Sequence, residues 1–151
     1  MTLKALQFLA LVLTALALVP AGAHLFELPN KIGLAQDQYF IVQGIYRGWA
    51  LFAFVLFPAL GATLAVTIAL RHHGSAHWLA LAGFLCIAAT LVIFFIWTYP
   101  ANIATNNWTI VPANWQALRL RWEYAHAVNA VLTFIALCLL TLSTLTTRPA
   151  R

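Results

Sequence analysis

The chain has 151 residues, of which 64% are hydrophobic and only 7% are charged. Soluble domains usually carry about 25% charged residues, so this composition excludes an ordinary soluble protein and indicates a membrane protein. The formal net charge of +5 comes from scattered basic residues rather than from a basic run, and we therefore expect no nucleic-acid partner.

Four apolar segments are long enough for membrane-spanning helices, each of which needs about 20 mainly apolar residues. We predict an all-α, integral membrane four-helix bundle that forms a single domain over residues 1–151. Two longer connections, 24–43 and 99–114, would lie on one membrane face, opposite the termini and the short connection 71–77. The predicted spans are residues 3–23, 44–70, 78–97 and 124–145.

The first segment also has features of a signal peptide, because Lys4 precedes the apolar run and Ala21-Gly22-Ala23 ends it. We interpret this segment as a retained spanning helix. Cys86 and Cys138 each lie inside an apolar run, so we expect two buried thiols and no disulfide.

The two membrane faces would carry equal numbers of basic residues, so the positive-inside rule alone does not decide the orientation. Three of the arginines on the loop face would pair with carboxylates inside the bundle, and without them the terminal face is more basic. We therefore expect cytoplasmic termini, in a bacterial inner membrane. The discounted residues are Arg47, Arg119 and Arg121; the basic residues on the terminal face are Lys4, Arg71, Arg148 and Arg151.

The end of the first helix carries His24 and Glu27, which are three residues apart and share a helical face. Because the residue before a proline disfavours the helical region, we expect this helix to end at Leu28-Pro29.

The fourth helix should begin after Asn114, a residue that often caps helix N-termini. At helical spacing its polar residues form one stripe, which should face other helices because a lipid-facing charge is costly. If the first and fourth helices are neighbours, His24, Glu27, Glu123 and His126 would share one cavity. The stripe consists of Arg119, Glu123, His126, Asn129 and Thr133.

Three interpretations of this cavity compete. In the first, His24, Glu27, Glu123 and His126 bind iron or copper, since Glu-x-x-His is typical of iron sites in helical bundles. In the second, no metal is bound: Glu123 orients His126, His126 takes a proton from a substrate, and Arg47 or Arg121 stabilises the resulting anion. In the third, the charges only neutralise one another and cap helix ends.

The same cavity would hold a hydrophobic small molecule. Tyr46 could reach it from the second helix, and Trp115 could roof it from above. We expect substrate contacts from Tyr46, Trp115, Trp122 and Asn129.

A family resemblance rests on the motifs Asn107-Trp108, Pro112, Trp115, Leu118-Arg119, Arg121-Trp122-Glu123 and His126. Over its last third the chain resembles the small four-helix membrane proteins of unknown function that are grouped with anthrone oxygenases. Some relatives carry arginine three residues after the histidine, where this chain has Asn129. The resemblance implies oxygenation of an anthrone to an anthraquinone, in which a base forms a carbanion that reacts with oxygen.

The leading functional hypothesis is therefore an oxygen-linked oxidation of a small aromatic or quinone-like molecule. The alternative is a non-enzymatic protein, either a small-molecule binder or transporter or an accessory subunit of a membrane complex. A transporter often shows internal repeats or broken helices, whereas this sequence has no repeat and only Pro58 as a mid-span breaker. The small residues 61–65 could contact a partner subunit or a second copy.

Overall fold

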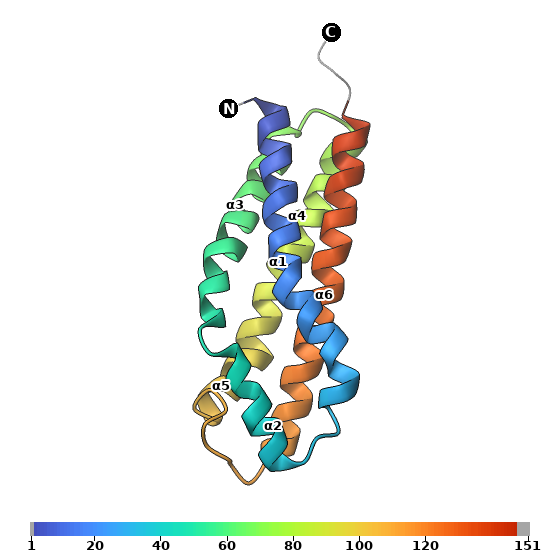
Figure 1. The fold of residues 1–151 in the computed structure, drawn as a ribbon. Helices are drawn as coiled ribbons and strands as arrows, with labels where there is room; N and C mark the ends of the chain where they lie inside the picture. The colour runs from blue at the N-terminus through green and yellow to red at the C-terminus, as the bar shows by residue number, and fades with distance from the viewer. Residues whose placement is uncertain (1, 148–151) are drawn as a thin grey trace.

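The computed structural model describes residues 2–147, which form helices and connecting loops without any strand (Figure 1). The predicted all-α fold class is confirmed. Two short 3-10 turns (η1, Gly44–Tyr46, and η2, Trp49–Phe52) and one π-helical turn (η3, Phe94–Thr98) join the α-helices. The α-helices are α1 (Leu3–Lys31), α2 (Gln36–Gln43), α3 (Ala53–Ala69), α4 (Ser75–Ile93), α5 (Tyr99–Ala104) and α6 (Trp115–Thr146).

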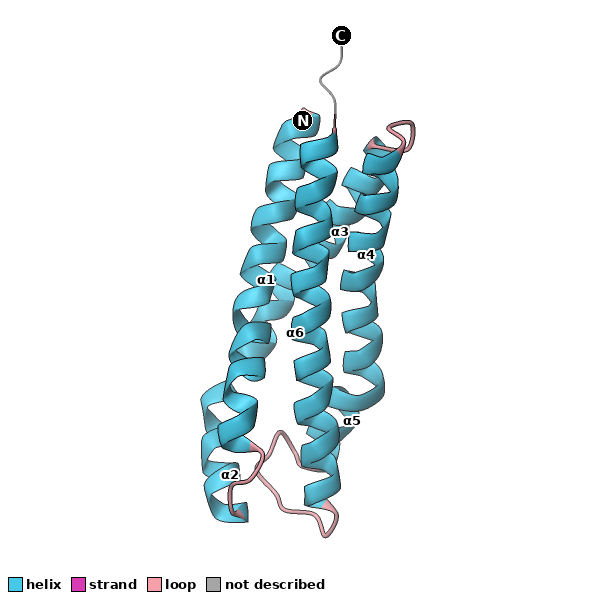
Figure 2. Cartoon of the chain, turned by 90° about the vertical axis from the view of Figure 1, so that its right-hand side faces the viewer, coloured by secondary structure: helices cyan, strands magenta, loops and turns pink. Residues whose placement is uncertain are grey.

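Four long helices form an up-down-up-down bundle in which α1 packs against α3 and α6, and α4 packs against the same two helices. The adjacency of α1 and α6 (Figure 2) fulfils the condition on which the predicted site depends. The start of α1, the end of α6 and the α3–α4 turn lie at one end of the bundle, here called the terminal end. The short helices α2 and α5 lie at the other, the loop end (Figures 1 and 2).

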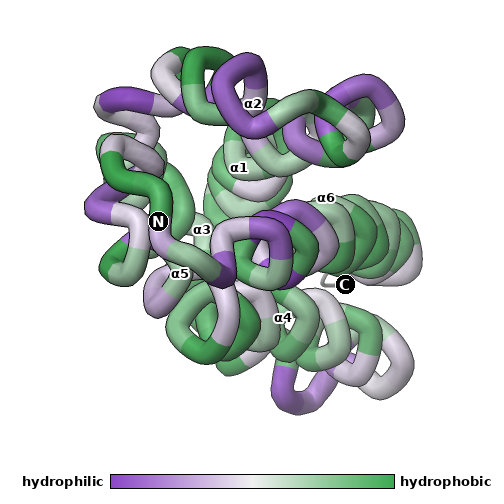
Figure 3. Tube along the Cα trace, turned by 90° about the horizontal axis from the view of Figure 1, so that it is seen from below, coloured by the Kyte–Doolittle hydropathy of each residue, from purple (hydrophilic) through white to green (hydrophobic). Residues whose placement is uncertain are grey.

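Within residues 2–147 the bundle has four helical stretches that are long and apolar enough to cross a membrane. Viewed from the loop end, hydrophilic residues gather in α2 and the connecting segments, while the long helices are mostly hydrophobic (Figure 3). Large apolar side chains such as Phe8, Phe57 and Phe134 are exposed on the outer surface, which indicates a lipid environment. The four stretches are Leu3–Lys31, Trp49–Ala69, Ser75–Ala104 and Trp115–Thr146.

The first helix continues past the predicted stop at Pro29 and ends at Lys31. A proline inside a helix removes one backbone hydrogen bond, here the bond to the carbonyl of Leu25. The bond from the Ile32 N–H to the Leu28 carbonyl, 3.0 Å long, still closes the last turn. This extra turn places Lys31 inside the protein.

The second predicted span is interrupted rather than continuous from residue 44. Gly48 has a φ of +89°, a backbone conformation that glycine adopts without steric penalty. The chain turns there, so α2 lies across the loop end and the membrane-spanning part begins at Trp49. Consequently Gln43 is buried whereas Arg47 is exposed, although one regular helix would place them on the same face.

The third predicted span is longer than expected, because η3 and α5 continue α4 to Ala104. The helix ends where Asn106, Asn107 and Trp108 adopt left-handed φ angles of 46°, 53° and 63°. Such angles are uncommon for residues other than glycine. The Trp108 N–H donates to Thr105 Oγ1 at 3.0 Å, which holds this strained turn and directs Trp108 inward.

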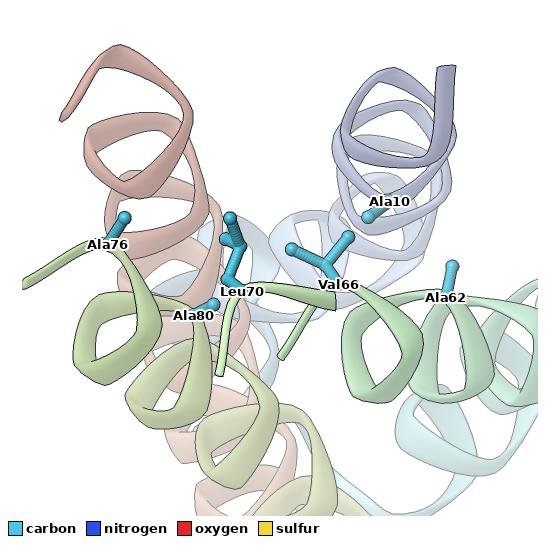
Figure 4. Close-up of a cluster of buried hydrophobic side chains, with 6 residues drawn as sticks. All are labelled: Ala10, Ala62, Val66, Leu70, Ala76 and Ala80. Atoms are coloured by element: carbon cyan, nitrogen blue, oxygen red, sulfur yellow. The ribbon is translucent and has the colours of Figure 1, made fainter. Parts of the chain in front are cut away.

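The terminal-end core, shown in Figure 4, is built from small aliphatic side chains of α1, α3 and α4. Small side chains let helix backbones approach closely, which favours helix association in a bilayer. The core consists of Ala10, Ala62, Val66, Leu70, Ala76 and Ala80. Two residues of the predicted partner segment 61–65, Ala62 and Thr63, are therefore packed inside the bundle.

Candidate functional site

A buried cluster of charged and aromatic residues occupies the loop end, where α1, α2 and α6 meet. α1 places its residues there by helical spacing: His24, Glu27 and Lys31 follow one another at intervals of three and four residues and share one face. The loop-end cluster consists of His24, Glu27, Lys31, Tyr39, Gln43, Tyr46, Trp122, Glu123 and His126.

Lys31 lies at the centre of the cluster and bridges two carboxylates. Its Nζ atom is 2.9 Å from Glu27 Oε1 and 3.0 Å from Glu123 Oε1, and it donates to the Tyr46 hydroxyl at 2.8 Å. The Lys31 and Glu123 side chains are 3% and 0% exposed. The ammonium also lies over the rings of Tyr46 and Trp122. Buried charges persist in proteins when they are paired in this way.

Tyr39 connects α2 to α6. Its hydroxyl donates to Glu123 Oε1 at 2.8 Å and accepts from Gln43 Nε2 at 2.6 Å. Burial raises the pKa of Tyr39, and the charge of Glu123 raises it further. Burial likewise raises the pKa of Tyr46, with an added effect from the Glu27 carboxylate. Both phenols therefore remain neutral and keep their protons for hydrogen bonding.

Two histidines stack at the α1–α6 seam. The ring centroids of His24 and His126 are 4.0 Å apart with an interplanar angle of 28°. His24 Nδ1 is 3.0 Å from Glu27 Oε1. The carboxylate only accepts, so in neutral His24 the proton is assigned to Nδ1 and the Nε2 atom is left with a free lone pair. Trp122 flanks both imidazoles, with centroids 5.0 Å from His24 and 4.2 Å from His126.

An aromatic layer closes the cluster toward the loops. Asn102 Oδ1 accepts from two indoles, Trp108 Nε1 at 3.2 Å and Trp122 Nε1 at 2.9 Å. Trp115 packs in the same layer, and the guanidinium of Arg119 lies 4.7 Å from its ring centroid. This arrangement fixes the orientation of Trp122 against the histidines.

An apolar groove of about 620 Å³ runs along the lipid-facing side of the α1–α6 seam. Gly22 and Ala23 of α1 line it next to His24, and Ala130 of α6 lines it one helical turn from His126. The groove therefore follows the same seam as the two stacked imidazoles. His126, unlike His24, is only partly buried.

The four residues predicted to share a cavity do come together, but their contacts differ from the acid/base prediction. Glu123 was expected to orient His126, yet its Oε1 atom binds Lys31 and Tyr39. The carboxylate–imidazole pair that does form is Glu27 with His24. Glu123 turns to Lys31 because opposite charges attract strongly when both side chains are buried, and Lys31 is the only cation bonded to this carboxylate within residues 2–147.

Arg47 and Arg121, predicted to stabilise an anion in the site, lie outside the loop-end cluster: both side chains are exposed and form no ion pair within residues 2–147. The turn at Gly48 directs Arg47 outward. Arg121 precedes Glu123 by two residues, and residues two apart do not share a helical face. The arginine that does lie near the cluster is Arg119, whose Nη1 donates to the Leu34 carbonyl at 2.8 Å.

The predicted substrate contacts divide into two groups. Tyr46 and Trp122 contact the histidines, with Tyr46 4.5 Å from His24 between ring centroids. Trp115 lies farther out, beside Tyr39. Asn129 faces α4, where its Nδ2 donates to the Thr90 carbonyl at 3.2 Å.

The predicted metal set does not fit a metal ion. Within residues 2–147 no three His, Cys, Asp or Glu side chains are arranged to hold one. The Lys31 ammonium lies between Glu27 and Glu123 and bonds one oxygen of each. Because this cation already bridges the carboxylates, the interpretation of His24, Glu27, Glu123 and His126 as metal ligands has no geometric support.

Sequence reasoning missed Lys31, Tyr39 and Asn102, and it noted Gln43 only as a polar neighbour of Tyr46 and Arg47 on the second helix. The spacing Glu27–Lys31 is the i,i+4 pattern of a helical ion pair, and it would have indicated Lys31 had the helix been extended past Pro29. Tyr39 and Gln43 share the same spacing in a helix of eight residues, which has no apolar period that identifies it. No sequence pattern indicated Asn102.

No family model, curated protein or solved structure matches this chain. The resemblance to the membrane proteins grouped with anthrone oxygenases therefore stays a prediction.

Proposed function

We propose that this protein is a membrane oxidoreductase with oxygenase-like chemistry that acts on a small aromatic or quinone-like molecule. The observation that carries the proposal is the stacked pair His24–His126 beside the apolar groove at the α1–α6 seam. A groove on the lipid-facing surface admits an apolar molecule sideways from the bilayer. Histidine is the side chain best suited to exchange protons near neutral pH.

His126 acts as the general base of the proposed reaction. Its ring stacks on His24, packs against the tilted ring of Trp122 and makes no hydrogen bond within residues 2–147, so a ring nitrogen can accept a proton from a bound molecule. For an anthrone, the base removes a methylene proton and the electron pair stays on carbon. The carbanion reacts with molecular oxygen; one oxygen atom becomes the new carbonyl and the other leaves as water.

The neighbouring residues position this base. Glu27 fixes the ring of His24 through Nδ1, and His24 in turn supports the ring of His126 by stacking. Trp122, held by Asn102, packs against the same imidazole and limits its movement. Since Lys31 already bonds both carboxylates, we propose a reaction without a protein-bound metal.

A second candidate is a non-enzymatic protein, either a small-molecule binder or an accessory subunit. The specific observation in its favour is that the three partners of Lys31, namely Glu27, Tyr46 and Glu123, account for its three donor hydrogens. A cluster satisfied in this way can hold α1 and α6 together without reacting.

For the membrane topology we propose a bacterial inner membrane with cytoplasmic termini. Lys31 forms buried ion pairs and Arg119 donates a hydrogen bond to the Leu34 carbonyl, so neither is counted as an exposed charge of the loops. That leaves only Arg47 and Arg121 exposed at the loop end, against the four basic residues that the sequence predicts for the terminal face. A C-terminal fusion to a reporter that is active only in the cytoplasm tests this topology; an inactive reporter on a folded fusion would contradict it.

The functional test measures oxygen uptake with anthrone by the full chain in lipid nanodiscs. We expect uptake above that of empty nanodiscs, and a loss of at least about a hundredfold in kcat for His126→Ala, the usual scale of a general base. His73→Ala, at an exposed histidine of the α3–α4 turn, is the matched control and should retain activity.

A glycine pair tests the groove separately from the base. A Cβ at Gly22 meets no atom within 4 Å, so Gly22→Leu adds a larger side chain at a position that lines the groove and has room at its first carbon. We expect a raised KM with a nearly unchanged kcat. Gly61→Leu, at an equally open position on α3, is the control.

The two candidate functions differ in their outcomes. If anthrone binds saturably, Gly22→Leu abolishes the binding and no oxygen is taken up, the protein is a binder. If the full chain shows no anthrone binding and no oxygen uptake, both candidates are contradicted.

A further inference from the structure

Six buried side-chain polar atoms have no hydrogen-bond partner within residues 2–147, and three of them belong to residues around Tyr39: Glu123 Oε2, Gln43 Oε1 and Arg119 Nε. Glu123 is 0% exposed and Gln43 is 4% exposed. A buried polar group without a partner costs about 1–3 kcal/mol, and more when it is charged. Such groups are rare in native proteins, so three in one region point to something that they bind.

The three residues converge on Tyr39. Glu123 and Gln43 both bond the Tyr39 hydroxyl, at 2.8 Å and 2.6 Å. The guanidinium carbon of Arg119 lies 5.3 Å from the centroid of the Tyr39 ring. Arg119 also precedes Glu123 by one turn on the inner face of α6. The three residues that carry the unpartnered atoms thus all contact Tyr39.

The hydrogen-bonding role of each atom follows from the network. A carboxylate only accepts, so the single hydroxyl hydrogen of Tyr39 goes to Glu123. The phenol oxygen then accepts from the amide NH₂ of Gln43, which fixes the amide orientation and leaves its Oε1 atom as an acceptor. Glu123 Oε2 is a second acceptor, and Arg119 Nε is a donor.

We propose that Glu123 Oε2, Gln43 Oε1 and Arg119 Nε bind a water molecule inside the loop end. A guest that pairs all three atoms must donate two hydrogen bonds and accept one. Water does so, and buried waters typically make about three such bonds. A cation is disfavoured by the positive charges of Arg119 and Lys31, and an anion is disfavoured by Glu123.

The position of this water gives it a role in proton exchange. Arg119 is only half-buried, so the site borders the loop surface, whereas Glu123 is wholly enclosed. The water links the enclosed, Lys31-bridged carboxylates to the aqueous side and lets them exchange protons. This role rests on the proposed function, whereas the water site itself does not.

The water site is tested by NMR on the isotopically labelled full chain in nanodiscs. We expect a dipolar cross-peak between water and the Arg119 Nε–H, distinguished by its sign in laboratory-frame and rotating-frame spectra from exchange with bulk water. Gln43→Met removes one acceptor and should reduce the cross-peak several-fold. Gln7→Met is the matched control, because Gln7 is equally buried but lies at the terminal end.

Absence of the cross-peak in the folded wild type would overturn the proposal, as would an unchanged cross-peak in a folded Gln43→Met variant. If Gln43→Met does not fold, the wild-type spectrum alone decides. A wild-type cross-peak combined with no oxygen uptake would retain the water site and reject the proposed enzymatic function.

Discussion

The two ends of the bundle are built from different kinds of contact. The terminal end is held by small aliphatic side chains, four of which are alanines, packed between α1, α3 and α4 (Figure 4). The loop end encloses an ammonium, two carboxylates and two imidazoles within a layer of tyrosines and tryptophans. One bundle therefore has an apolar core at one end and an ionic network at the other, with α1 contributing to both.

The two ends differ in whether their contacts are needed for the stability of a helical bundle in a membrane. In a bilayer, helices associate through close packing, because lipid is as apolar as the side chains themselves. The terminal end meets this need with alanines. Burying ion pairs is expensive, and well-packed apolar residues often stabilise a fold as well or better. The loop-end network is thus more than stability requires, which favours a functional interpretation.

The largest effect is expected from removing the central cation of the network. Lys31→Met leaves Glu27 and Glu123 without their shared partner inside the protein. Breaking a buried ion pair from one side typically costs about 3–5 kcal/mol. We expect a loss of that size in the free energy of unfolding, measured by equilibrium unfolding in mixed detergent.

Lys4→Met is the matched control, since Lys4 belongs to the same helix but is exposed at the terminal end. An exposed substitution usually changes stability by less than about 0.5 kcal/mol. Equal effects of the two substitutions would show that the loop-end network does not differ energetically from an exposed charge.

A smaller effect is expected from enlarging a side chain in the terminal-end core. Ala10 is 1% exposed and packs against Val66 and Ala62 of α3. Ala10→Leu overfills this contact, which typically costs about 1–3 kcal/mol. Ala5→Leu, at an exposed position of the same helix, should be nearly neutral.

The same variant also separates the two ends functionally. If the terminal end is only scaffold, Ala10→Leu should lower stability while the KM for anthrone stays unchanged. A change in KM as large as that expected of Gly22→Leu would mean that the two ends are coupled.

The sequence predicted most of the fold and the inner face of α6. Glu123, Asn129 and Thr133 of the predicted stripe are buried as their helical spacing indicated, and Arg119 and His126 are partly buried. The start of α6 after Asn114 is also confirmed, although the Asn114 side chain makes no capping hydrogen bond. These predictions succeeded because periodicity along one long helix determines which residues face inward.

The contacts within the site were less predictable. Lys31 was assigned to a loop because a local proline rule favoured an early helix end, whereas tertiary contacts keep the last turn of α1 helical. The partner of Glu123 could not be read from spacing, since Tyr39 comes from a short helix 84 residues earlier. Long-range pairings depend on how the chain turns at positions such as Gly48.

The smallest effect concerns the two buried phenols of the loop end. The pKa values of Tyr39 and Tyr46 are raised, chiefly by burial, so neither should form phenolate near the ordinary tyrosine pKa of about 10. Tyr39→Phe combined with Tyr46→Phe should therefore leave the ultraviolet absorbance change of the folded protein near this pH unchanged. The unfolded variant should show less phenolate than the unfolded wild type, which is the internal control.

The raised pKa values of Tyr39 and Tyr46 also determine how the free energy of unfolding changes at alkaline pH. Above pH about 10 the unfolded chain loses protons that the folded chain keeps at Tyr39 and Tyr46, so the free energy of unfolding falls as pH rises. Below that pH the contribution of the two phenols is fully present. The double variant lacks both groups and should show a shallower alkaline decline than the wild type. Parallel declines would mean that both phenols ionise as readily in the folded protein as in the unfolded chain, and that the loop end is open to water.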